Sequence, residues 1–163
     1  VKLPPHVGTR QARAAKLTLL KAGYNAKISI ETYYPSSDPH LGPGSGITIW
    51  AETESGAILG SSSLGKPGKP AERVGREAAS SLVAQLKTGF AVDRYLTDQL
   101  IPYIALAEGR SEIWSTELTT HTLTNVELVE KILGVKFEID GKLGEPGRIS
   151  VEGRGLTRGS NFD

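Results

Sequence analysis

The apolar positions in the first part of the chain alternate between helical and strand spacing. Residues 6–22 carry apolar side chains at helical intervals, with basic residues between them, and predict an amphipathic helix that ends at Gly23. Residues 26–30 then alternate apolar and polar, which is the period of a half-buried strand. Residues 47–52 and 57–60 show the same period on either side of Ser55-Gly56, and this pattern predicts a hairpin.

Segments rich in glycine and proline separate these elements. Residues 35–39 and 42–46 are expected to be loops, because their prolines and glycines exclude regular structure. A similar segment, residues 65–70, precedes a long helix expected over residues 71–88 and ended by Gly89. We place a domain boundary there, between residues 1–89 and residues 90–163.

The second part of the chain predicts two further helices and three strands. We expect a helix over residues 93–107, followed by a strand over residues 111–116 with Ile113 and Trp114 on opposite faces. Thr124 and Glu127 have the spacing of a capping box, and Leu123 and Leu128 that of a hydrophobic staple. This pattern places His121 just upstream of a helix that ends at Gly134. The remaining segments are expected to be strands over residues 135–139 and 148–151 and a loose tail over residues 153–163.

The fold class is therefore α/β or α+β, in two small units that each pack helices against a sheet. A length of 163 residues, 38% of them hydrophobic and 23% charged, is typical of a globular protein. The formal net charge of +1 means that any nucleic acid must be held by a local cluster of cations. Because the chain has no cysteine and no apolar run of about 20 residues, we expect a cytoplasmic protein without a membrane contact.

The chain begins at Val1 and runs almost directly into a helical pattern. We expect it to be either a fragment or the product of an alternative start codon written as valine.

One candidate site is a polar stripe on the helix expected over residues 93–107. Helical spacing brings Tyr95, Asp98, Gln99 and Pro102 to one side of it. Pro102 has no N–H to donate to the carbonyl of Asp98, so we expect the helix to bend there. Simple solvation of these polar side chains would explain the same pattern.

His121 is the second candidate, in a threonine-rich segment before the predicted helix. A neutral imidazole is a good nucleophile near pH 7 and can attack phosphorus without a separate base. A nearby helix N-terminus would disfavour the imidazolium and attract phosphate. A histidine that merely hydrogen-bonds to threonines remains the alternative, and we assign no role to His6 or His40.

Basic side chains form the third candidate. Cations that could contact RNA phosphates stand on the loop and helix start around residue 70, and two more stand near the C-terminus. The first group is Lys66, Lys69, Arg73 and Arg76, and the second is Arg154 and Arg158. An ordinary solvated surface explains both groups equally well.

Five segments, taken in order along the chain, resemble the RNA 3'-terminal phosphate cyclases, over nearly the whole chain from residue 3 to about residue 153. They are residues 3–7 (LPPHV), 41–46 (LGPGSG), 65–72 (GKPGKPAE), 98–100 (DQL) and 121–125 (HTLTN). The resemblance implies an ATP-dependent reaction that converts an RNA 3'-phosphate into a 2',3'-cyclic phosphate through a histidine-AMP intermediate. His121 matches the adenylylated nucleophile, and Tyr95 matches the residue that packs on adenine. Asp98 and Gln99 match side chains near the nucleotide phosphates, with Asp98 beside Mg²⁺ or Mn²⁺.

The family's proteins are considerably longer than this chain. The resemblance implies that residues 1–89 are most of an inserted small domain, without its first strand, and that residues 90–163 are the last catalytic segment. We therefore expect the isolated chain to be inactive and to need either a chain that supplies the other half or self-association. The rival hypotheses are a cyclase-like ribosome-assembly binding protein, whose relatives lack the histidine, an inactive truncated fragment, and an enolpyruvyl transferase, which would not explain the His121 motif.

Overall fold

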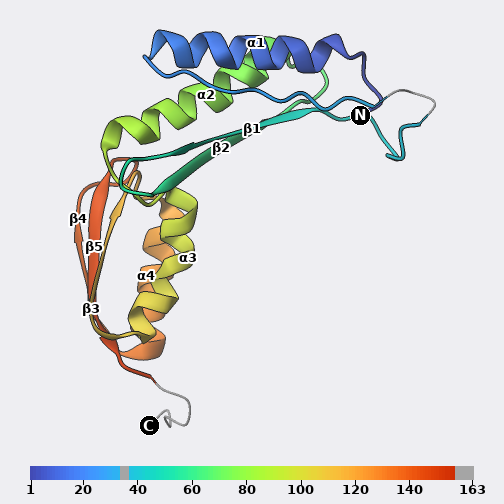
Figure 1. Cartoon of the computed structure of the whole chain (residues 1–163). Helices are drawn as coiled ribbons and strands as arrows, with labels where there is room; N and C mark the ends of the chain where they lie inside the picture. The colour runs from blue at the N-terminus through green and yellow to red at the C-terminus, as the bar shows by residue number, and fades with distance from the viewer. Residues whose placement is uncertain (34–36, 157–163) are drawn as a thin grey trace. The chain divides into compact units, whose positions relative to one another are not determined.

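The computed structural model describes residues 1–33 and 37–156, and the chain divides into two compact units, Val1–Lys87 and Thr88–Asp163. Each described unit contains a small antiparallel sheet and helices, so the expected mixed α/β class is confirmed (Figure 1). The division falls two residues before the boundary expected after Gly89. Among the described residues, no helix combines the length and the apolar character needed to span a bilayer.

The first unit contains the helices α1 (His6–Lys21) and α2 (Ala71–Thr88) and the hairpin strands β1 (Gly46–Glu52) and β2 (Ile58–Leu64). The strands pair antiparallel with Ile49 opposite Ser61, as the alternating pattern predicts. Both helices also match their predictions, α2 with the same bounds.

The strand predicted over residues 26–30 is wrong. No described strand pairs with this segment, and Ile28 and Ile30 are 36% and 48% exposed. A strand is stabilised by hydrogen bonds to a neighbour, and alternation of side chains alone does not supply that neighbour.

The two helices of the first unit approach each other closely at Gly75. A Cβ atom placed on Gly75 would lie 2.1 Å from the carbonyl oxygen of Gln11, so only glycine fits against the backbone of α1. Next to this crossing lies a small apolar core between the helices and the hairpin, made of Ala15, Leu19, Leu59, Ala79, Leu82 and Val83.

The second unit packs two helices on one face of a three-stranded sheet (Figure 1). Its elements are α3 (Arg94–Leu106), β3 (Glu108–Ser115), α4 (Thr120–Leu133), β4 (Phe137–Asp140) and β5 (Gly147–Arg154). The strand order is β3-β5-β4, and both pairings are antiparallel. Gly153 and Arg154, expected in a loose tail, belong to β5, and residues 157–163 of that tail lie outside the described residues.

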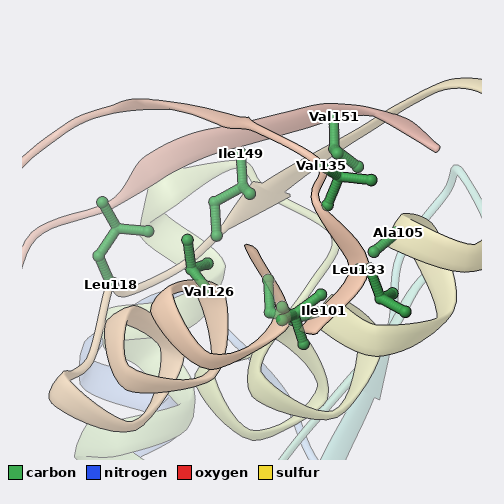
Figure 2. Packing of buried hydrophobic residues seen from close by; sticks show 9 residues of the cluster. Ile101, Ala105, Leu118, Val126, Leu133, Val135, Ile149 and Val151 are labelled. Carbon is green, nitrogen blue, oxygen red and sulfur yellow. The ribbon is translucent and has the colours of Figure 1, made fainter. Parts of the chain in front are cut away.

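The core of the second unit lies between the helices and β5 (Figure 2). Ile101 from α3 and Ile149 from β5 are fully buried, and Val126 from α4 is nearly so. Ile113 packs against this cluster, whereas Trp114 is 44% exposed on the other face, as the strand period predicts. This core holds α3 and α4 in place against the sheet.

Replacing Gly75 should destabilise the first unit, because an added methyl group must displace the backbone of α1. We expect Gly75→Ala to lower the free energy of unfolding by about 1–3 kcal/mol in urea titrations. Gly60→Ala is the matched control, since its Cβ would meet only a carbonyl oxygen at 3.8 Å. Equal stability of the two variants would contradict the close approach.

Candidate active site

The helices α3 and α4 begin at the same end of the sheet. Val92, just before α3, pairs parallel with Ser115, the last residue of β3, and α4 starts a few residues later. The amide of Thr116 donates to the carbonyl of Val92 at 2.8 Å. The first turns of both helices are therefore tied to one strand end.

Asp93 caps α3 and fixes its first turn. Its Oδ1 accepts hydrogen bonds from the amides of Tyr95 and Leu96, each at 2.8 Å. One turn further along, the Thr97 hydroxyl donates to Ser115 Oγ at 2.7 Å in the interior of the unit. Residues 95–99 are thus held by contacts to the helix cap and to the sheet.

The cap of α4 is Thr119, and the capping box predicted at Thr124 and Glu127 is wrong. Thr119 has an extended backbone, and its hydroxyl accepts a hydrogen bond from the amide of Thr122 at 3.1 Å. Glu127 instead pairs with Lys131 on the helix surface. The helix begins earlier than predicted because Thr119 follows the buried Leu118, which anchors the chain at that point.

His121 therefore lies inside the first turn of α4 and not upstream of the helix. The residue is exposed, and no hydrogen bond to its ring occurs among the described residues. The amide groups of the first turn of a helix have no acceptor within the helix and carry its positive dipole end. An imidazole in this position can meet a phosphate that the same helix end attracts.

Asn125 links the helix that carries His121 to Asp98. The Asn125 amide nitrogen donates to Asp98 Oδ1 and, at 3.3 Å, to the carbonyl oxygen of Asp98. His121 precedes Asn125 by four residues on the same helix, so their Cβ atoms lie about 5–6 Å apart on one face. Asn125 is a site residue without a role in the sequence prediction, although it stands in the HTLTN segment.

Tyr95 is 60% exposed near the start of α3, and Gln99 is exposed one turn further on. The guanidinium of Arg94 lies 4.8 Å from the centroid of the Tyr95 ring and donates to its hydroxyl at 2.9 Å. This hydrogen bond raises the pKa of Arg94, and Glu117 pairs with the same guanidinium at 3.1 Å. Sequence reasoning missed Arg94, which carries no motif of its own.

The candidate site could hold a divalent cation only if a bound nucleotide supplied some of the ligands. Within residues 1–33 and 37–156, no three histidine, aspartate or glutamate side chains gather closely enough to hold a metal ion. Asp98 nevertheless keeps Oδ2 without a hydrogen bond among the described residues. One carboxylate together with nucleotide phosphates is an ordinary ligand set for Mg²⁺.

The basic residues predicted to contact RNA gather in the first unit. Lys66, Lys69 and Arg73 line a shallow cavity of about 370 Å³ at the start of α2, and Arg76 follows on that helix. Lys69 and Arg73 both pair with Glu77 and hold the pKa of its carboxyl at about 2, below the ordinary value of 4.5. Part of the positive charge is therefore neutralised within the protein.

Of the two C-terminal cations predicted to contact RNA, Arg154 lies within the described residues. Arg154 donates to the carbonyl of Leu133 at 2.8 Å and so supports the end of α4. Arg158 lies outside the described residues.

Comparison with known proteins identifies relatives of this chain. Residues 1–87 match the family model of the RNA 3'-terminal phosphate cyclase insert domain. The chain is 49% identical over 156 residues to the RNA 3'-terminal phosphate cyclase of Methanopyrus kandleri, covering 95% of this chain and 44% of that protein. It is 51% identical over 158 residues to the cyclase of Desulfurococcus amylolyticus, with the same coverage. The chain thus spans less than half the length of these relatives.

Removal of the α4 cap should loosen the turn that carries His121. We expect Thr119→Ala to lower the free energy of unfolding by about 1 kcal/mol, because the amide of Thr122 loses its acceptor. Thr124→Ala, inside the helix, should change it by much less. Urea titration of both variants distinguishes the observed cap from the predicted one, and a larger loss at Thr124 would contradict the structure.

Proposed function

We propose that His121 is the residue that accepts AMP from ATP. The basis of the proposal is that this chain belongs to the RNA 3'-terminal phosphate cyclase family. The observation that carries the proposal is an exposed imidazole in the first turn of α4, on the helix face whose next turn contacts Asp98. The proposal concerns the complete cyclase, of which this chain supplies one part.

The proposed reaction has three displacements at phosphorus. A ring nitrogen of His121 attacks the α-phosphorus of ATP, a P–N bond forms, and the bond to pyrophosphate breaks. An oxygen of the RNA 3'-phosphate then displaces the histidine and takes the AMP. Finally the adjacent 2'-hydroxyl attacks the 3'-phosphorus, AMP leaves, the hydroxyl proton passes to solvent, and the 2',3'-cyclic phosphate closes.

The surroundings of His121 suit the first step. The positive end of α4 would lie where negative charge develops on the phosphates, and it would stabilise that charge. Asp98, held through Asn125, would keep its second oxygen toward Mg²⁺ or Mn²⁺, and this cation would neutralise charge on the departing pyrophosphate. Gln99 would face the phosphates, and the open side of the Tyr95 ring would pack on adenine.

The proposed active site also includes residues that this sequence does not contain, because the sequence spans 44% of the M. kandleri cyclase. We propose that a second chain carrying the remaining part of a cyclase, or a second copy of this chain, covers α3 and α4. Large apolar side chains on these helices are exposed, with Tyr103 at 70%, Ile132 at 65% and Leu128 at 52%. The proposed setting is the cytoplasm, which agrees with a chain that contains no cysteine.

Labelling with α-labelled ATP tests the proposed nucleophile. We expect acid-labile, alkali-stable label on a chimera in which this chain replaces the matching part of the M. kandleri cyclase. His121→Ala should reduce the label by at least about a hundredfold, because no other group replaces the nucleophile. His40→Ala is the matched control and should keep it.

The outcomes of the labelling experiment separate the hypotheses. Label that survives His121→Ala would refute the role of His121. A folded chimera that binds RNA but takes no label would favour the non-catalytic binding protein. Label on the chimera and none on the isolated chain would show that the remaining part is required.

RNA binding by the basic residues of α2 and its preceding loop should depend on salt. We expect Lys66→Ala and Arg76→Ala in the chimera each to make the negative slope of log affinity against log salt shallower by about 0.7. Lys69→Ala should change it less, and Glu77→Gln should strengthen binding, because Glu77 neutralises Lys69 and Arg73. Lys131→Ala, which removes a cation paired with Glu127, is the control. Unchanged slopes for Lys66 and Arg76 would remove them from the interface.

The exposed apolar side chains of α3 and α4 predict that the chain associates with a second copy or with the remaining part of a cyclase. We expect size-exclusion chromatography to show a species larger than the monomer, either for the chain alone or for its mixture with the remaining part of the M. kandleri cyclase. Leu128→Ser with Ile132→Ser should reduce that species, whereas Lys142→Ser should not. A stable, folded monomer in both samples would contradict the proposal.

A further inference from the structure

Pro102 leaves one carbonyl group of α3 without its usual partner. In an α-helix the carbonyl of residue 98 accepts from the amide of residue 102, and proline has no such amide. A half-buried carbonyl without a donor is costly, so another group is expected to serve it.

Asn125 is the group that serves this carbonyl. Its amide nitrogen lies 3.3 Å from the carbonyl oxygen of Asp98 and also donates to Asp98 Oδ1. An NH₂ group has two hydrogens, so it can satisfy both acceptors at once. The reversed amide would place an oxygen against two oxygens, and the contact therefore determines the orientation of Asn125.

We propose that Asn125 is a positioning residue for the Asp98 carboxylate and that Pro102 keeps the Asp98 carbonyl available for it. The bond to Oδ1 leaves Oδ2 without a hydrogen bond among the described residues, so that it could bind a divalent cation. The bond to the carbonyl adds a second attachment, so the carboxylate cannot turn without breaking a backbone contact. Because Asn125 and His121 share one face of α4, the same residue sets the carboxylate relative to the nucleophile. The catalytic part of this inference rests on the proposed function, and the structural part does not.

A double-mutant cycle on the isolated chain tests the structural part. Asn125→Ala should lower the folding equilibrium constant about tenfold, because the carbonyl oxygen and Oδ1 of Asp98 both lose their hydrogen-bond donor. In a Pro102→Ala background the loss should be at least about threefold smaller, since the new amide at position 102 can serve the carbonyl. Equal losses in the two backgrounds would overturn the link between Pro102 and Asn125.

Metal dependence of adenylylation in the chimera tests the catalytic part. Asn125→Ala should raise the Mn²⁺ concentration for half-maximal labelling about tenfold, with a smaller change in the rate at saturating Mn²⁺. Val151→Ala, a core variant, is the control for lost stability and should leave the metal dependence unchanged.

The two parts fail in different ways. A chimera that labels normally, with the same Mn²⁺ dependence in Asn125→Ala, overturns the positioning role and leaves the proposed function intact. A chimera that takes no label overturns the proposed function together with the catalytic part of the inference. The double-mutant cycle on the isolated chain still decides whether Pro102 and Asn125 are coupled. A shift in Val151→Ala as large as in Asn125→Ala would reduce the role of Asn125 to stability.

Discussion

The contact between Asn125 and Asp98 is the point on which the candidate site depends. It joins the first half of α3 to the first half of α4 through one side chain, and the apolar core below it holds the same helices against β5. The contact fixes the Asp98 carboxylate relative to the helix that carries His121. A carboxylate and an imidazole therefore lie on the first halves of the two helices, where we propose that the helix dipoles attract phosphate.

The remainder of the second unit supports that arrangement by fixing where each helix begins. Asp93 and Thr119 cap the two helices, and the bridge between Val92 and Ser115 ties both starts to the end of β3. The first unit uses a different device, a glycine that lets α1 and α2 approach, and its cations are partly neutralised by Glu77. The second unit carries the candidate chemistry, and the first unit is the part that matches the insert-domain model of the family.

Periodicity in the sequence predicted most of the elements because the side chains that face each core recur at regular intervals. It succeeded for α2, for the hairpin and for the opposite faces of Ile113 and Trp114. It failed for residues 26–30, since pairing depends on a neighbour that alternation cannot reveal. The capping-box spacing placed the start of α4 too late, because the same segment contains a second threonine, Thr119, which is the observed cap. Asn125 could not be found this way, because its partner is distant in sequence. Pro102 was a local signal, because it leaves the Asp98 carbonyl without a backbone donor.

The arrangement of α3 and α4 can be measured directly by nuclear Overhauser spectroscopy of the isotope-labelled chain. The account predicts cross-peaks between the side-chain amide protons of Asn125 and the β-protons of Asp98, with slow exchange of those amide protons with water. An Asn125 amide that exchanges rapidly and shows no cross-peak to α3 would contradict it, because the Asp98 carboxylate would then not be held by the helix that carries His121.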